Sequence, residues 1–103
     1  MTFLYKDIYY FLYNMTDLES EFNLKSEKIR NSSTNPSIPI ENNVKLNFYK
    51  YYKQSTIGDC NTPQPYIYQF EKRALWDAWY SIKGTTKEEA MKMYIYYADL
   101  YLD

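Results

Sequence analysis

The chain has 103 residues but no histidine, a single cysteine and only two glycines. Without histidine, Cys60 has no imidazole partner for a Cys/His nucleophilic pair. One cysteine also excludes an internal disulfide and a zinc site built from several cysteines. Gly58 and Gly84 are too few for a glycine-rich phosphate loop. We therefore predict no catalytic residue, no metal and no cofactor, and the lone thiol fits a reducing compartment such as the cytoplasm.

Excess positive charge and long apolar runs are absent as well. The formal net charge is -1, with 24% charged residues, whereas proteins that grip nucleic-acid phosphates carry a surplus of Lys and Arg. No run reaches the roughly 18 apolar residues of a membrane-spanning helix. The apolar stretch over residues 3–13 contains Lys6 and Asp7 and lacks the flanks of a signal peptide. We exclude nucleic acid as a partner and predict no transmembrane helix.

Tyrosine, by contrast, is abundant, with 14 copies. Each has a large apolar ring and one hydroxyl, so tyrosines can build a core and still present hydrogen-bonding groups at a wet cleft. The length suits one domain with a modest core. We expect a single domain over residues 1–103.

Three helices are expected in the second half of the chain, where apolar residues recur at helical spacing. They cover about residues 43–57, residues 71–82 and the segment from Thr86 to the C-terminus. Gly58 and Gly84 supply stop signals after the first two. Thr86 and Glu89 form a capping box that starts the last one. No segment alternates as a strand does, so the pattern predicts an all-α fold.

The first half of the chain begins with a strongly apolar segment. Leu4, Ile8, Phe11 and Met15 form the stripe of an amphipathic helix over residues 1–15. This helix either packs on a bundle or lies on a membrane surface, where aromatic side chains are common.

Residues 16–41 are interpreted as an insertion after that helix. Thr16 and Glu19 form a possible capping box before a short helix over about 17–30, and residues 31–39 have the polar and proline-rich composition of a loop. The insertion is either a tolerated surface segment or a cover over part of a ligand cleft. Its covering side chains would be Leu18, Phe22 and Ile29.

Several motifs recur in a fixed order between residues 44 and 103. They comprise Tyr49, Tyr52, Lys53 and Gln54; Thr56, Gly58, Asp59, Asn61 and Pro65; Trp76, Asp77, Ala78 and Trp79; and Lys83, Gly84, Thr85, Lys87, Glu88, Ala90, Met91, Lys92, Tyr94 and Ile95. In this order they resemble the acyl-CoA-binding protein family. The resemblance implies an all-α four-helix bundle, in which residues 16–41, without a counterpart in the family, are a partly helical insertion between helices one and two.

The resemblance also implies ligand-binding residues. These are Leu46, Tyr49, Lys50, Tyr51, Tyr52, Lys53 and Tyr94. Tyr49 looks like the residue that meets the adenine nucleotide, with Lys53 reaching the 3′-phosphate. Taken without the family, Lys53 is an ordinary solvated lysine. Tyr94 resembles a further contact to the CoA part, Tyr52 belongs to the same wall as Tyr49, and Leu46 lies nearer the acyl chain.

The chain departs from the family at three positions where a lysine is usual. They are Leu75, Glu71 and, if Tyr5 is aligned with the first-helix aromatic of the family, Tyr13. Losing one charge-assisted phosphate contact costs about 1.5 to 3 kcal/mol. We hypothesise that Arg73 compensates, with Lys50 and Lys72 as alternatives.

The leading hypothesis is a non-enzymatic carrier that binds long- or medium-chain fatty acyl-CoA esters, buffers them and delivers them to acyl-CoA-using enzymes. The alternative is an interaction module on the same bundle that binds a protein or a membrane surface through helix one and the insertion. Retention of Tyr49, Lys53 and Tyr94 favours the carrier. Leu75 and Glu71 favour the alternative.

Overall fold

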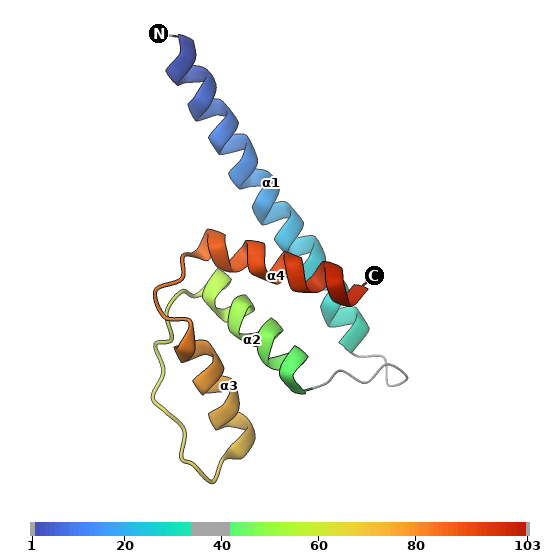
Figure 1. The fold of residues 1–103 in the computed structure, drawn as a ribbon, viewed down its shortest axis with the longest axis vertical. Coiled ribbons are helices and arrows are strands. Elements are labelled where there is room, and N and C mark those ends of the chain that lie inside the picture. Colours follow the sequence, from blue (N-terminus) through green and yellow to red (C-terminus); the bar gives the residue numbers. More distant parts are fainter. Residues whose placement is uncertain (1, 34–41, 103) are drawn as a thin grey trace.

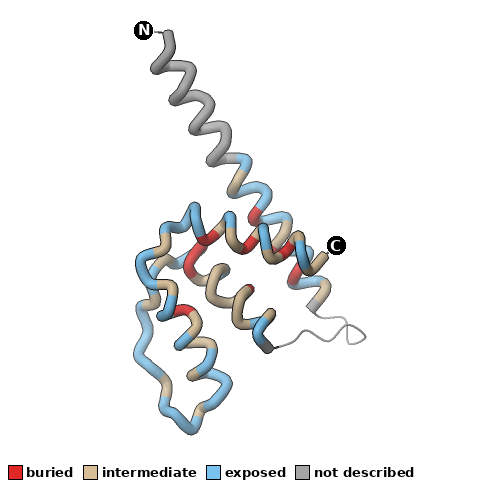
Figure 2. Tube along the Cα trace, viewed as in Figure 1, coloured by how far each residue is buried: buried red, intermediate tan, exposed pale blue. Residues whose placement is uncertain are grey.

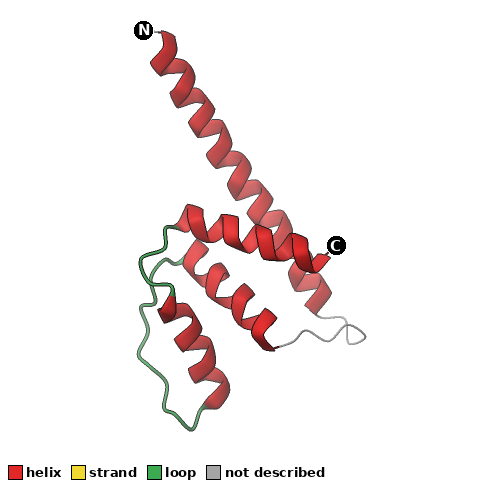
Figure 3. Cartoon of the chain, viewed as in Figure 1, coloured by secondary structure: helices red, strands yellow, loops and turns green. Residues whose placement is uncertain are grey.

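A computed structural model describes the backbone of residues 2–33 and 42–102 and the side chains of residues 17–32 and 43–102. Its helices are α1 (Thr2–Ser33), α2 (Asn42–Thr56), α3 (Phe70–Ser81) and α4 (Lys87–Leu102) (Figure 3). The part of the chain that is described contains no strand. The all-α prediction is confirmed, and the predicted bounds of the last three helices agree closely with the observed ones.

The helices contact one another in the order α1, α4, α2, α3. α4 packs against both α1 and α2, and α2 packs against α3 on its other side. The N-terminal half of α1 runs away from the other three helices, whereas its C-terminal half crosses α4 (Figure 1). α3 therefore touches the bundle mainly through α2.

The core lies where α1, α2 and α4 meet (Figure 2). Its buried members are Phe22, Ile29, Phe48, Tyr94 and Ala98. Tyr94 is at the centre, because its ring lies 5.1 Å from that of Phe22 and 5.3 Å from that of Phe48, measured between centroids. Aromatic pairs at this separation add to the stabilisation given by area burial.

α1 differs from the predicted arrangement of a helix, a break and a second short helix. It is one continuous helix of 32 residues, because the chain has no glycine or proline before Pro36. Its bundle-packing residues are Phe22, Ser26 and Ile29, all buried and spaced by about one turn. Residues 17–30 are helical as expected, but they form the packing helix and not an insertion. The side chains of the expected stripe at Leu4, Ile8, Phe11 and Met15, and most of the expected loop over 31–39, lie outside the described residues.

The predicted start and stop signals act as expected. Thr86 Oγ1 accepts a hydrogen bond from the Glu89 N–H at 3.1 Å, and α4 begins at the next residue, Lys87. Gly58 and Gly84 have φ of 104° and 94°, in the left-handed region that favours glycine.

The apolar side of α3 is only partly buried. Trp79 is buried at 2% exposure, whereas Leu75, Ala78 and Ile82 are of intermediate exposure. The reason is that α3 has one main neighbouring helix, α2, so Trp79 alone among the residues of α3 is buried. Trp79 Nε1 also donates to the Gly58 carbonyl at 2.8 Å, which ties α3 to the end of α2.

A polar network joins the loops that follow α2 and α3. Gln54 has no exposed surface, and its Nε2 donates to Asp59 Oδ1 at 2.8 Å and to the Thr85 carbonyl at 2.7 Å. The Gly84 N–H donates to the same Asp59 oxygen at 2.8 Å. The bond from Gly84 and, next, that from Gln54 hold the pKa of the Asp59 carboxyl below its ordinary value of 3.8.

This network predicts a loss of stability in acid. Because the pKa of Asp59 is lower in the folded state, its contribution is complete above the ordinary value and is lost as the pH falls through the folded pKa. We expect the free energy of unfolding to fall between about pH 5 and pH 2 by a smaller amount in Asp59→Asn than in the wild type. Urea titrations over that range measure it, with Asp17→Asn on the exposed side of α1 as control. An identical acid profile in wild type and Asp59→Asn would contradict the assignment.

Candidate functional site

An open hollow of about 470 Å³ lies among α1, α2 and α4, directly beside the core. We call it the tyrosine hollow; its lining residues are Ser26, Ile29, Arg30, Phe48, Tyr49, Tyr52 and Tyr94. Tyr49 and Tyr52 are one turn apart on α2, so both project to the same side of the helix. Three of the predicted ligand-binding residues, Tyr49, Tyr52 and Tyr94, are therefore brought together.

Burial and charge determine the protonation state of the tyrosines in this hollow. Burial and, less strongly, the nearby Tyr52 phenol raise the pKa of Tyr94 to about 12, and the positive charge of Arg30 opposes this rise. Burial, followed by the influence of Cys60, also raises the pKa of Tyr49. The hydroxyls of Tyr49 and Tyr94 thus remain protonated at neutral pH and can donate hydrogen bonds.

Lys53 lies next to the tyrosine hollow, one turn after Tyr49. Its Nζ is 5.7 Å from the centroid of the Tyr49 ring and 5.6 Å from that of Trp79. Two aromatic faces at this range hold the ammonium group by cation–π attraction. Lys53 is therefore close to Tyr49, as predicted, although it is not among the residues that line the hollow.

A second open hollow, of about 490 Å³, lies between α2 and α3. We call it the apolar hollow; its lining residues are Lys45, Leu46, Phe70, Glu71, Ala74 and Leu75. Four of the six are apolar. Leu46 and Tyr49 thus lie in two different hollows, because α3 shelters Leu46 while α1 and α4 shelter Tyr49.

Lys50 and Tyr51 line neither of these hollows. Tyr51 faces α4, where its ring stacks on that of Tyr97 at 5.8 Å between centroids. Lys50 Nζ lies 5.1 Å above the Tyr51 ring. Burial, and then the neighbouring Tyr97, raise the pKa of Tyr51. Tyr51 thus belongs to the packing of α2 on α4, and Lys50 lies against the ring of Tyr51.

Arg73 is also placed differently from the expectation. Its Nε pairs with Asp77 Oδ1 at 3.3 Å, and its Nη1 donates to the Pro65 carbonyl at 3.3 Å. The side-chain oxygen of Gln64, in the amide orientation that satisfies both groups, accepts from Arg73 as well. The guanidinium is thus used to hold the connection between α2 and α3, and it lines neither hollow.

The sequence analysis missed Ser26 and Arg30, which line the tyrosine hollow from α1. The signal for Arg30 was present. The spacing from Tyr5 to Tyr13, by which a family lysine was placed, is the same as the spacing from Phe22 to Arg30. Counted from the buried Phe22 and not from Tyr5, the same spacing leads to Arg30.

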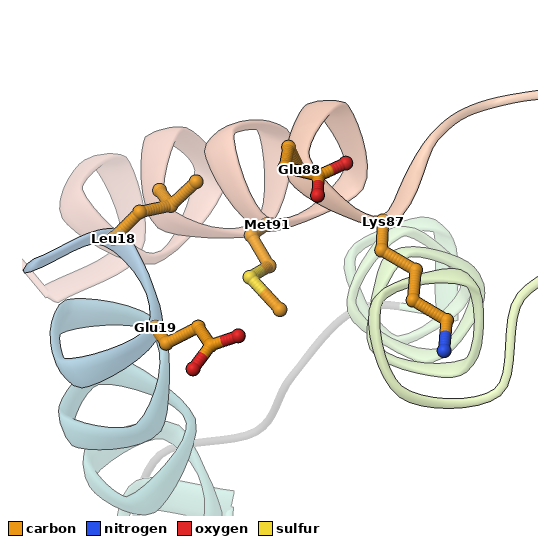
Figure 4. A pocket seen from close by; sticks show the side chains of 5 residues that line it. All are labelled: Leu18, Glu19, Lys87, Glu88 and Met91. Atoms are coloured by element: carbon orange, nitrogen blue, oxygen red, sulfur yellow. The ribbon is translucent and has the colours of Figure 1, made fainter. Parts of the chain in front are cut away.

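Two further hollows are less suited to a ligand. One of about 60 Å³ lies where α1 meets the start of α4 and is lined by Leu18, Glu19, Lys87, Glu88 and Met91 (Figure 4). It is far below the roughly 300 Å³ at which small-molecule pockets begin. The other, of about 290 Å³, is a shallow recess of α2 and α4 lined by Val44, Asn47, Phe48, Tyr97, Leu100 and Tyr101.

Neither a metal site nor a membrane span is found in the described part of the chain. Within residues 17–32 and 43–102, no cluster of His, Cys, Asp and Glu side chains is arranged to hold a metal ion. None of the described helices has the length and apolar character needed to cross a bilayer.

The two hollows together offer three kinds of contact along α2. Arg30 in the tyrosine hollow and Lys53 beside the Tyr49 ring supply positive charge, the tyrosines supply flat rings with hydroxyl groups, and Leu46 with Leu75 supplies apolar surface. Such an arrangement suits a ligand with a polar, anionic and aromatic part joined to an apolar part.

Comparison with known proteins identifies the relatives of this arrangement. The family model for acyl-CoA-binding protein matches residues 19–98. The chain is 42% identical over 78 residues to acyl-CoA-binding domain-containing protein 3 of Oryza sativa subsp. japonica, covering 76% of this chain and 48% of that protein. It is 43% identical over 83 residues to the acyl-CoA-binding domain-containing protein 6 homolog of Dictyostelium discoideum, covering 79% of this chain and 28% of that protein.

A solved structure agrees with the sequence comparison. The crystal structure of Oryza sativa acyl-CoA-binding protein 2 superposes with a TM-score of 0.79 at 38% identity, covering 87% of this chain and 94% of that one. The curated relatives named above are longer than the matched part, so the chain spans less than half of their length. The family match begins at residue 19, inside the segment that had been interpreted as an insertion.

Proposed function

Because the chain belongs to the acyl-CoA-binding protein family, we propose that it is a non-enzymatic carrier of fatty acyl-CoA esters. The observation that carries the proposal is the placement of the tyrosine hollow, with Arg30 and Lys53, next to the apolar hollow on the same helix, α2. Cations and tyrosines suit the phosphates and adenine of CoA, and the apolar hollow suits a fatty tail. We further propose that residues 1–103 act as one domain, because the described core is a single cluster.

The head group is assigned to the tyrosine hollow. Tyr49 is proposed to stack on or hydrogen-bond the adenine, with Lys53 at the 3′-phosphate. Arg30 takes the phosphate role that Arg73 was expected to take, since Arg30 lines the tyrosine hollow and Arg73 does not. A guanidinium can bind phosphate by two parallel hydrogen bonds, which makes Arg30 suited to this role. Tyr94, with its hydroxyl protonated, donates to the head group.

The fatty tail is assigned to the apolar hollow, along Leu46, Phe70, Ala74 and Leu75. Each methylene that is removed from water contributes about 0.8 kcal/mol, so ten of them contribute about 8 kcal/mol before the cost of ordering. The tail then dominates the affinity. The carrier works by sequestration: it keeps the tail from water, buffers the free ester and delivers it to acyl-CoA-using enzymes. We place it in the cytoplasm, where the thiol of Cys60 stays reduced.

Isothermal titration calorimetry tests the proposal, with palmitoyl-CoA, free CoA and palmitate at submicellar concentrations and fixed salt. We expect palmitoyl-CoA to bind far more tightly than either free CoA or palmitate, because only the complete ester fills both hollows. Failure to bind palmitoyl-CoA would overturn the proposal. Equal affinities for palmitoyl-CoA and palmitate would reject the assigned role of the tyrosine hollow.

Leu75 gives a further prediction, because it lines the apolar hollow that is assigned to the tail, whereas the family usually has a phosphate-binding lysine at this position. We expect Leu75→Lys to weaken palmitoyl-CoA binding by at least tenfold, because the substitution places a charge against the tail. The affinity for free CoA should stay within twofold of the wild type, since free CoA does not occupy this hollow. Calorimetry with palmitoyl-CoA and with free CoA measures both affinities, with Ser81→Lys on the exposed side of α3 as the matched control. Tighter binding of free CoA by Leu75→Lys alone would place the head group beside α3 and contradict the assignment.

A further inference from the structure

The connection from α2 to α3 carries a patch of exposed apolar side chains. Tyr66, Ile67, Tyr68 and Phe70 are 70%, 74%, 69% and 80% exposed. We call these four residues the aromatic tip. Figure 2 shows that this connection is exposed along most of its length and lies away from the core. Single exposed apolar residues are ordinary, but four within five consecutive positions form a patch of the kind that marks a binding surface.

The exposure of the aromatic tip is fixed by the fold. Trp76 Nε1 donates to the Thr62 carbonyl at 2.8 Å, and Arg73 Nη1 donates to the Pro65 carbonyl at 3.3 Å, so α3 holds the segment before the tip. Within the tip, the Gln69 N–H donates to the Tyr66 carbonyl at 2.9 Å. The rings of Tyr66 and Tyr68 stack nearly parallel, 5° apart, with centroids at 5.6 Å. The tip is therefore presented in a set shape before any partner is bound.

Charge is missing from this segment. Residues 60–70 read CNTPQPYIYQF and contain no Asp, Glu, Lys or Arg, although charged residues make up 24% of the chain. A surface without charge can enter a less polar environment without the cost of desolvating an ion. Tyrosine, with an apolar ring and a polar hydroxyl, is enriched where membrane and water meet.

The aromatic tip is continuous with the apolar hollow, because Phe70 belongs to both. We propose that the aromatic tip binds the interfacial region of a lipid bilayer and brings the mouth of the apolar hollow to the membrane surface. A fatty chain would then pass between bilayer and hollow with little exposure to water. The statement on chain transfer rests on the proposed function, whereas binding of the tip to a bilayer does not.

A bilayer fits the tip better than a protein partner does. Protein interfaces commonly include Arg and a charged rim that sets orientation. Residues 60–70 contain no charged residue, and the neighbouring Arg73 guanidinium is bonded to the Pro65 carbonyl and to Asp77. A bilayer requires only apolar and aromatic groups that can insert into it. It looks the same from every direction in its plane, so the rotation of the protein about the membrane normal does not matter. The binding should therefore be nearly independent of salt, since charges do not contribute to it.

Flotation with phosphatidylcholine vesicles tests the proposal on the full chain without any acyl-CoA. We expect the wild type to float with the vesicles and Tyr66→Ser/Ile67→Ser/Tyr68→Ser to lose at least tenfold in partition coefficient. Phe70 is kept so that the apolar hollow is unchanged. Tyr96→Ser/Leu100→Ser, two exposed apolar residues of α4, is the matched control and should stay within twofold of the wild type. Raising the salt from 50 to 500 mM should change the wild-type partition by less than twofold.

Three outcomes would overturn the proposal. They are a wild type that does not float, a tip variant that floats like the wild type, and a partition that collapses in high salt. A second variant, Phe3→Ser/Ile8→Ser/Phe11→Ser, shows whether the start of α1 is responsible instead. Calorimetry with palmitoyl-CoA keeps the two proposals apart. A tip variant that binds palmitoyl-CoA but not vesicles is folded and supports the tip, whereas a wild type that binds vesicles but not palmitoyl-CoA rejects only the carrier function.

Discussion

Replacing Arg30 with alanine is expected to weaken palmitoyl-CoA binding by about ten- to a hundredfold. The estimate follows from the loss of one charge-assisted phosphate contact, about 1.5 to 3 kcal/mol. Arg30 lines the tyrosine hollow, and its charge acts on Tyr94, so a head group in this hollow lies within reach of the guanidinium. Calorimetry should show a similar loss for free CoA and little change for palmitate.

Two matched variants sharpen this prediction. Lys28→Ala removes a cation from the exposed side of the same helix and should leave the affinity within twofold. Arg73→Ala removes the residue that sequence reasoning favoured, and its effect on affinity should be much smaller than that of Arg30→Ala. A larger loss for Arg73→Ala would return the phosphate role to α3 and contradict the assignment.

Replacing Trp79 with alanine is expected to lower the free energy of unfolding by about 3 to 5 kcal/mol. Trp79 is 2% exposed, donates to the Gly58 carbonyl and lies under the Lys53 ammonium group. Its removal leaves a cavity between α2 and α3 and an unpaired carbonyl. The free energy of unfolding of a small domain is only about 5 to 15 kcal/mol in total, so Trp79→Ala should lose much of the stability.

Trp76 provides the comparison for Trp79, because it lies one turn earlier on α3 and is only half-buried. It stacks on Tyr80 at 4.8 Å between centroids and donates to the Thr62 carbonyl. We expect Trp76→Ala to lower the free energy of unfolding, measured by urea titration, by less than half as much as Trp79→Ala does. Equal losses would mean that the stack on Tyr80 and the bond to Thr62 stabilise the fold as much as burial does.

Local signals were sufficient to predict most of the helical framework. The Thr86 cap and the stops at Gly58 and Gly84 act through bonds and dihedral angles a few residues away, so the sequence contains all that determines them. The continuity of α1 was not predicted, because a pair such as Thr16 and Glu19 marks a helix start only where the preceding residues are not helical. The absence of any helix breaker before Pro36 was the stronger signal.

The candidate site was predicted in part, since it depends on how the helices pack. Tyr49, Tyr52 and Tyr94 converge because α2 and α4 are neighbours. Arg30 could be placed only once Phe22, Ser26 and Ile29 were known to pack on the bundle. The partners of Arg73 were not predicted, because the positions of the Pro65 carbonyl and Asp77 are set by the path of the connection before α3. These are tertiary contacts that a pattern along the chain does not contain.

The most direct test of the two-hollow account is an amide NMR titration of the labelled protein with palmitoyl-CoA and, separately, with free CoA. We predict that free CoA shifts amides around the tyrosine hollow, at Arg30, Tyr49 and Tyr94. Palmitoyl-CoA should shift these and also the amides of Leu46 and Leu75. Two results would contradict the account. One is a set of shifts outside both hollows, and the other is a shift of the Leu46 and Leu75 amides when free CoA is added without the fatty tail.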